Sequence, residues 1–149
     1  MTLRRVRRLK VHALGMPRPQ GSMTPMLAKG SSNRIFLKAP STTMEWRAIV
    51  TGAATKAMKK KKWRTHDGPI ILGLVFTFAR PKSMPKWQRE HVEKFNGADL
   101  DKLCRAIGDA LGDAGVYTDD RQIQRIVAEK RFGDTQGAHI VVTALEIDR

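Results

Sequence analysis

Six aspartates lie close together in the last third of the chain, and they are the residues whose type and spacing best suggest chemistry. They are Asp99, Asp101, Asp109, Asp113, Asp119 and Asp120. Two carboxylates about 5 Å apart repel by roughly 3 kcal/mol at an effective dielectric near 20, so a converging set would need a cation. Mg²⁺ fits because it needs few protein carboxylates, keeps several waters and accepts phosphate oxygens. Such a site could activate water and stabilise the departing oxygen of a phosphodiester.

Each of these aspartates also has a purely structural explanation. Asp99 lies where a helix is expected to begin, and aspartate is a common N-cap that favours the helix dipole. Asp101, Arg105 and Asp109 recur every four residues, so they could form a solvated helix face with weak ion pairs. The pair at 119–120 is equally typical of a turn. At this point the residues leave both explanations open.

The charge of the chain is divided between two regions. The 149 residues carry 28 Lys/Arg and 14 Asp/Glu, a net charge of +14. Residues 1–98 hold 21 of the cations and four of the acids, a net charge of +17, whereas residues 99–149 have a net charge of −3. This balance favours a polyanionic partner, with nucleic acid ahead of an anionic membrane surface. No apolar run reaches the roughly 18 residues that a membrane span needs, so we expect no membrane partner.

Length and composition predict one domain, residues 1–149, with a core of its own. The single cysteine, Cys104, excludes an intramolecular disulfide and favours the reducing cytoplasm. Residues 15–40 are rich in Gly, Pro, Ser and Lys, which predicts a long basic loop.

The hydrophobic pattern predicts six regular elements. Apolar alternation or apolar runs indicate four strands, at residues 6–14, 70–78, 122–132 and 138–147. Helical spacing indicates two helices, at residues 42–61 and 99–114. Thr42 and Glu45 form a predicted capping box, Gly115 ends the second helix, and residues 133–137 are expected to join the last two strands as a hairpin. The order β-α-β-α-β-β predicts an α/β domain with a mixed sheet and two helices packed on it.

The position of Asp120 relative to Asp99 and Asp101 depends on the direction of residues 115–120. Extended, these residues span about 20 Å at 3.3 Å each, and the helix from 101 to 113 is also about 20 Å long at 1.5 Å per residue. The segment can therefore just return Asp120 to the start of the helix.

Other chemistry is poorly supported. The four histidines have no zinc spacing, and Cys104 is expected to be a packed thiol. Trp63 and Trp87 border basic segments, where each could stack on a base or simply pack. The run from Lys59 to Lys62 could be a solvated helix end or a phosphate contact.

Residues 98–123, ADLDKLCRAIGDALGDAGVYTDDRQI, resemble the signature of the RusA family of Holliday junction resolvases, which are small phage and prophage endonucleases. The family pattern is roughly D-x-D-N-L-x-K, then D-A-L, then a short stretch with an aromatic residue, then D-D-x-Q-[VI]. Residues 15–20, GMPRPQ, resemble the family's G-x-P-x-P loop, and Lys130 stands where a basic residue usually ends the strand after D-D. The resemblance spans about residues 8–146.

The resemblance implies a homodimer that binds a four-way DNA junction and makes paired, symmetric cuts with Mg²⁺, or with Mn²⁺ as a substitute. By position, Asp99, Asp101 and Asp120 match the essential acidic residues and metal ligands, and their neighbour Asp119 is expected to help as a further metal ligand. Lys102 replaces the usual Asn, and Arg105 replaces a catalytically important Lys. Arginine keeps the charge needed to clamp phosphate but does not titrate.

We therefore expect Arg105 to stabilise charge on the scissile phosphate, and we expect Asp109 and Asp113 to have structural roles. Contacts to nucleic acid are expected from Arg18, Lys82, Lys86, Lys102 and Lys130. The expected location is the cytoplasm of a bacterial or phage-infected cell. The two departures at 102 and 105 motivate one alternative, a catalytically inactive junction-binding protein of the same fold. A basic RNA-binding protein is the other.

Overall fold

The computed structural model describes residues 2–21, 24–27, 35–38, 41–85 and 93–148. Its helices are α1 (Ser41–Lys61) and α2 (Leu100–Ala114), with a short 3₁₀ turn, η2 (Asp120–Gln122). Its strands are β1 (Thr2–Leu14), β2 (Thr24–Leu27), β3 (Ile35–Lys38), β4 (Ile70–Phe78), β5 (Ile123–Phe132) and β6 (Gly137–Asp148). The described helices include none that is long and apolar enough to cross a membrane.

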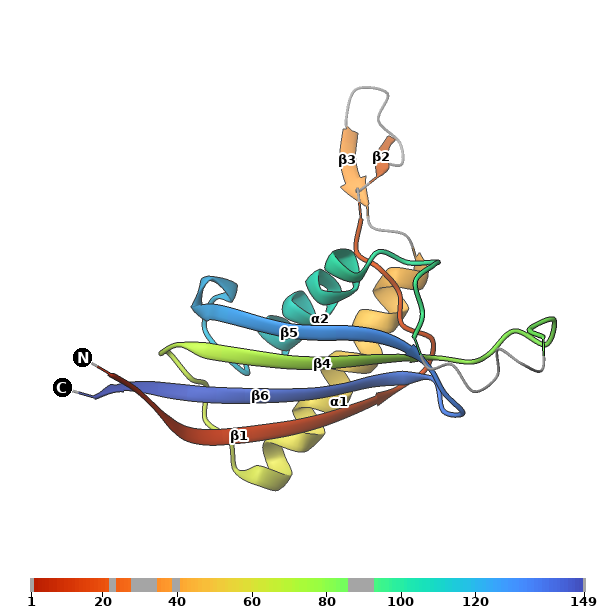
Figure 1. Cartoon of the computed structure of the whole chain (residues 1–149). Helices are drawn as coiled ribbons and strands as arrows, with labels where there is room; N and C mark the ends of the chain where they lie inside the picture. Colours follow the sequence, from red (N-terminus) through yellow and green to blue (C-terminus); the bar gives the residue numbers. More distant parts are fainter. Residues whose placement is uncertain (1, 22–23, 28–34, 39–40, 86–92, 149) are drawn as a thin grey trace.

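Four of the strands form a mixed sheet in the order β1-β6-β4-β5. Strand β6 pairs antiparallel with both β1 and β4, whereas β4 and β5 are parallel. Both helices lie on one face of this sheet (Figure 1). The predicted α/β class with a mixed sheet and two packed helices is confirmed.

The predicted hairpin between the last two strands is wrong. Strand β4 lies between β5 and β6, so the turn after Phe132 crosses the end of β4. The reason is the connection before β5. Helix α2 joins β4 to β5 as a crossover, and a crossover makes neighbouring strands parallel. This leaves the other side of β4 for β6.

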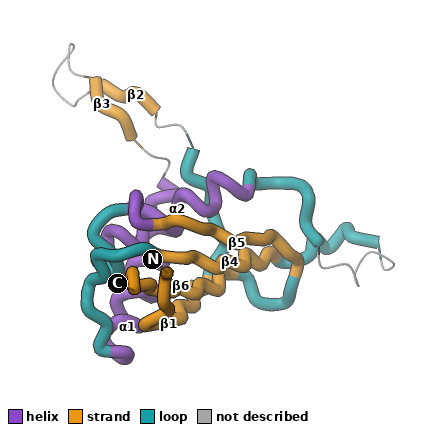
Figure 2. Tube along the Cα trace, turned by 60° about the vertical axis from the view of Figure 1, so that its left-hand side comes forward, coloured by secondary structure: helices purple, strands orange, loops and turns teal. Residues whose placement is uncertain are grey.

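A small antiparallel hairpin, β2–β3, lies within the predicted long loop at residues 15–40 and was not predicted. It projects away from the main sheet (Figure 2). Helix α1 begins at Ser41, so Thr42 is inside the helix and not its N-cap as predicted. The hydroxyl of Thr43 donates to the carbonyl of Pro19 at 3.0 Å, which attaches the start of α1 to the chain that leaves β1.

The core lies between the sheet and the helices. Alternate residues of β4 are buried toward the helices, from Ile70 to Phe78. Helix α2 buries a stripe that includes Leu103, Ile107 and Leu111, and α1 buries Trp46 and Val50. Each fully buried large side chain contributes about 1.5–3 kcal/mol, so this stripe fixes which face of α2 is left toward solvent.

The segment after α2 turns back along the core. Gly115 has φ 82°, a left-handed conformation that favours glycine, and it ends the helix as predicted. The next residues run beside residues 65–67: Val116 accepts from the backbone N–H of His66 at 3.1 Å and from the Trp63 indole at 3.0 Å. The Tyr117 hydroxyl donates to the carbonyl of Gly108 on α2. This return path brings residue 120 beside α2.

Candidate active site

The exposed side of α2 forms one wall of a groove that gathers three carboxylates. Asp101, Asp109 and Arg105 come from α2, and Asp120 comes from the returning segment. The groove has a volume of about 400 Å³ and is completed by Cys104, Gly108, Ile123 and Ile126. We call it the acidic groove. The length of the return segment allowed Asp120 to reach Asp101 without requiring it, and the two residues line the same groove.

Asp120 is positioned by the cap of η2. The Asp119 carboxylate accepts from the backbone N–H of Arg121 at 2.9 Å, and the Gln122 side chain accepts from the backbone N–H of Asp119 at 2.7 Å. The hydrogen bond from Arg121 holds the pKa of Asp119 below its usual value. The Gln122 amide also donates to the carbonyls of His66 and Gly68. Asp119 is thus occupied as a cap, and Asp120 is left exposed in the groove.

Asp109 was assigned a structural role from the sequence, yet the structure places it in the acidic groove. Its carboxylate accepts from the Gln20 amide at 2.5 Å. Gln20 is only 5% exposed, and its backbone N–H donates to the carbonyl of Lys102 at 3.0 Å. Sequence reasoning did not single out Gln20. The only signal was its place at the end of the GMPRPQ motif. Asp113, by contrast, lies outside the groove lining and forms an ion pair with Arg47 at 2.7 Å.

Asp99 lines a second groove, on the other side of the α2 N-terminus. It is the N-cap residue of α2, but its side chain makes no capping hydrogen bond. Instead its Oδ2 lies 3.3 Å from the Nζ of Lys102. The groove has a volume of about 440 Å³, and Arg18 is also in its lining. The structure therefore brings Asp101 and Asp120 together but places Asp99 in an adjoining groove, with two of the cations predicted to contact nucleic acid.

The other predicted contacts to nucleic acid are spread more widely. The Lys130 ammonium donates to the carbonyls of Asn96 and Ala98 at 3.1 and 2.9 Å, so β5 holds the segment that enters α2. Lys82 is exposed on the segment after β4. Lys86 and Trp87 lie outside the described residues. Trp63 is 7% exposed and packs under Arg7, whose guanidinium carbon lies 4.4 Å from the ring centre.

The donor atoms of the acidic groove suit a hard cation. Its carboxylates offer oxygen ligands, which Mg²⁺ prefers. Burial, followed by the charge of Asp101, raises the pKa of the Cys104 thiol to about 11. The thiol therefore stays protonated near neutral pH and is a poor ligand for a soft metal. Among the described residues, no three His, Cys, Asp or Glu side chains are grouped closely enough to hold an ion. This arrangement fits Mg²⁺, which is commonly held by one or two carboxylates together with waters and phosphate oxygens.

An α/β fold that brings Asp101, Asp120 and the Arg105 guanidinium to one groove, in a strongly basic chain, has the groups expected of a protein that acts on phosphate groups. The chain belongs to the endodeoxyribonuclease RusA family, whose sequence pattern matches residues 17–143. The match covers both grooves at α2 and all of β4, β5 and η2. This family consists of Holliday junction resolvases, endonucleases that act on branched DNA. A search of curated proteins found no match to the chain.

Proposed function

We propose that the protein is a Mg²⁺-dependent endodeoxyribonuclease that cuts four-way DNA junctions by paired, symmetric hydrolysis of phosphodiester bonds. The observation that carries the proposal is the meeting of Asp101, Asp120 and Arg105 in one groove, within the region that matches the family. The oxygen-rich lining supports Mg²⁺ as the cofactor, with Mn²⁺ as a substitute because it shares the preference for oxygen ligands.

The residues have distinct roles in this proposal. Asp101 and Asp120 would hold the metal from the two walls of the acidic groove. Asp99, which lines the adjoining groove, would join them by releasing its ion pair with Lys102. When bound, the metal supplies Lewis-acid stabilisation of the phosphate and lowers the pKa of a water molecule. Arg105 donates to the phosphate oxygens as negative charge develops on them. Hydrolysis adds water to phosphorus and breaks one P–O bond of the backbone.

Cations around the active site position the strand that is cut. Arg18 and Lys102 line the groove that contains Asp99 and supply charge for the neighbouring phosphates. Asp119 acts through Asp120: by capping η2 it fixes the backbone that presents the Asp120 carboxylate. Lys130 likewise fixes the segment before α2 through the carbonyls of Asn96 and Ala98.

A homodimer is part of the proposal because a four-way junction has two symmetry-related strands to cut. A pair related by a two-fold axis supplies two identical sites. A cruciform plasmid tests this directly. Two cuts within one binding event give linear plasmid at once, whereas a monomer gives nicked circles that become linear only after a second encounter.

The replacement Asp101→Asn tests the catalytic role. It removes a metal ligand but keeps the shape of the side chain, so we expect cleavage of a synthetic junction to fall below detection. Binding of the same junction in a gel-shift assay should be unchanged or tighter, because a negative charge has been removed near phosphate. Loss of binding in step with cleavage would show that Asp101 serves folding or DNA binding and not catalysis.

The alternative, a catalytically inactive junction-binding protein, is tested with the unmodified protein. Lys102 and Arg105 suggest this alternative, because both residues depart from the family pattern. If the protein binds junctions tightly but leaves them intact in both Mg²⁺ and Mn²⁺, that alternative is correct and the proposed nuclease activity is wrong.

A further inference from the structure

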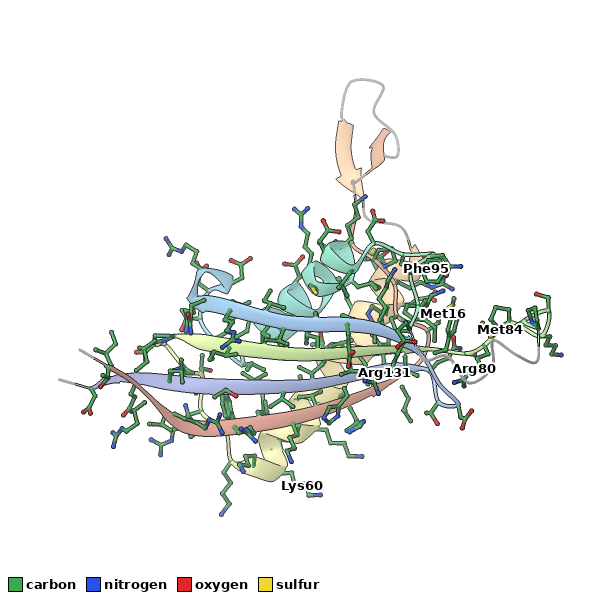
Figure 3. The ribbon with its side chains drawn as sticks, in the orientation of Figure 1. Met16, Lys60, Arg80, Met84, Phe95 and Arg131 are labelled. Atoms are coloured by element: carbon green, nitrogen blue, oxygen red, sulfur yellow. The ribbon has the colours of Figure 1, made fainter. Side chains whose placement is uncertain are left out.

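A groove at the opposite edge of the sheet gathers cations from two elements. Strand β1 contributes Arg8 and Lys10, and the last turn of α1 contributes Lys60 and Lys61. Only Leu9 and Ala57 complete the lining, and the volume is about 570 Å³. We call it the basic groove. Because β1 and β5 are the two outer strands, the basic and acidic grooves lie at opposite edges of the sheet. Figure 3 shows Lys60 beyond β1, on the side away from α2.

The four cations of the basic groove have no ion pair or hydrogen bond with a described residue. Some cations elsewhere on the molecule are paired: Arg4 with Glu146, Arg47 with Asp113, and Arg131 with Glu129. Arg7, near Arg8 on the same strand, lies over Trp63 and donates to the carbonyl of Arg64. The basic groove is therefore a place where positive charge is concentrated and left uncompensated.

Ordinary structural roles explain the cations of β1 and the lysines of α1 separately, but they do not explain why both sets line one groove. Lysines at the end of a helix interact favourably with its dipole, and charged residues on an edge strand discourage pairing with other chains. Neither role requires the two sets to line the same groove, where like charges repel. A polyanion in the groove would remove this repulsion and exchange its own counterions for the four cations.

We propose that the basic groove is a second nucleic-acid-binding surface, which holds the sugar–phosphate backbone of duplex DNA away from the site of cutting. Its lining contains no described aromatic side chain on which a base could stack and no carboxylate or amide side chain that could read a base edge. Binding there is independent of sequence, of a branch and of a metal ion. The proposal goes beyond the proposed function, because the acidic groove takes no part in it.

Helical geometry offers a matched control on the same helix. Ala57, Lys60 and Lys61 face the groove, and at 100° per residue Lys59 is on the opposite side of α1. All the lysines of this last turn are exposed. Replacing Lys61 or Lys59 by Gln therefore removes the same charge from the same turn, and only the first change removes a side chain from the groove.

The experiment measures binding of an unbranched duplex to the full chain in EDTA, across a range of salt concentrations. We expect Lys61→Gln to weaken binding about fivefold near physiological salt and to reduce the slope of log K against log salt by about 0.9, as for one lost phosphate contact. The double replacement Lys10→Gln/Lys61→Gln should reduce the slope by about twice as much. Lys59→Gln should change the slope by less than half as much as Lys61→Gln.

Two further readouts separate this proposal from its competitors. Single-turnover cleavage of a junction at saturating protein should be the same for Lys61→Gln and the unmodified protein. Labelled poly-glutamate serves as an acidic polypeptide probe. The proposal is overturned if Lys61→Gln and Lys59→Gln weaken duplex binding equally, because only net charge then matters. It is also overturned if Lys61→Gln weakens poly-glutamate binding but leaves duplex binding unchanged, because the groove is then a site for a protein partner. The duplex measurements do not depend on whether the protein cuts DNA.

Discussion

The two edges of the sheet differ in how their charges are compensated. At the β5 edge, carboxylates gather in the acidic groove around Arg105, which has no described partner, whereas Lys102 is held by Asp99 and Arg121 by Asp119. At the β1 edge, four cations share a groove without a described partner. A site that cuts must hold its groups in a fixed geometry before the substrate arrives. A surface that holds a phosphate backbone needs only charge in the right place. The strong positive charge of residues 1–98 is therefore not simply background for the acidic cluster.

The largest expected effect is a difference in cleavage rate between variants of two adjacent carboxylates, Asp119 and Asp120. Asp120→Asn should lower single-turnover junction cleavage by about a thousandfold, because it removes a group that acts on the reacting phosphate through the metal. Asp119→Asn should change the rate by less than about fivefold, because asparagine is as good an N-cap as aspartate. Quench-flow cleavage of both variants at saturating metal measures the difference. Equal losses would mean that Asp119 binds the metal directly.

The next effect concerns the guanidinium in the acidic groove. Arg105→Gln should lower cleavage by roughly a hundredfold, because a donor to the developing negative charge is lost. Arg105→Lys should keep most of the activity, since it retains the positive charge. Junction affinity measured in EDTA should change little for either variant. A pH–rate profile that gains a high-pH limb only in the Lys variant would show that cleavage needs the positive charge at this position, because lysine loses its proton at high pH and arginine does not.

A smaller effect is expected where the GMPRPQ segment meets α2. Gln20→Ala removes the hydrogen bond to the Asp109 carboxylate and should lower stability by about 1.5–3 kcal/mol, as for a buried bond to a charged group. Thermal melting should fall by about 5 °C for a chain of this size. Asp113→Asn is the comparison, because it removes an exposed ion pair on the same helix and should cost at most about 1 kcal/mol. Equal losses of melting temperature for Gln20→Ala and Asp113→Asn would show that the Gln20–Asp109 hydrogen bond does not stabilise α2 more than an exposed ion pair does.

The smallest effect is a pH dependence close to the basic edge. Burial lowers the pKa of His139, and the charges of His12 and Lys10 lower it further. The unfolded chain therefore binds the proton more readily than the folded chain. The stability associated with neutral His139 is fully present above about pH 6.5 and is lost as the pH falls below that value. Lowering the pH from 7.5 to 5.5 should reduce the melting temperature, and His139→Gln should reduce this drop by about 1–3 °C. An unchanged drop would contradict the assignment to His139.

Much of the fold and part of the site could be predicted from residue spacing. The four-residue repeat of Asp101, Arg105 and Asp109, opposite a buried stripe, fixed one wall of the acidic groove. The length of residues 115–120 then allowed Asp120 to reach it. Helix periodicity and segment length are both determined by neighbouring residues, so both can be predicted from the sequence.

Contacts between distant segments could not be predicted in the same way. The placement of β6 beside β4 depends on which edge of β4 the α2 crossover leaves open. The hairpin expected at residues 133–137 considered only the short connection between β5 and β6 and not the free edge of β4. Gln20 meets Asp109 across 89 residues, with no periodicity to indicate it. The separation of Asp99 from Asp101 depends on the backbone turn at the N-cap, where two residues of sequence direct the side chains into different grooves.

The most direct test of the central claim is cleavage of a synthetic four-way junction, with each strand labelled in turn, in Mg²⁺ and in EDTA. We expect nicks at symmetric positions in two opposing strands in Mg²⁺ and none in EDTA, with the Asp101→Asn protein inactive in both. Intact junctions in Mg²⁺ and in Mn²⁺, or cleavage that persists in EDTA, would contradict the assignment of the acidic groove as a metal-dependent site of cutting.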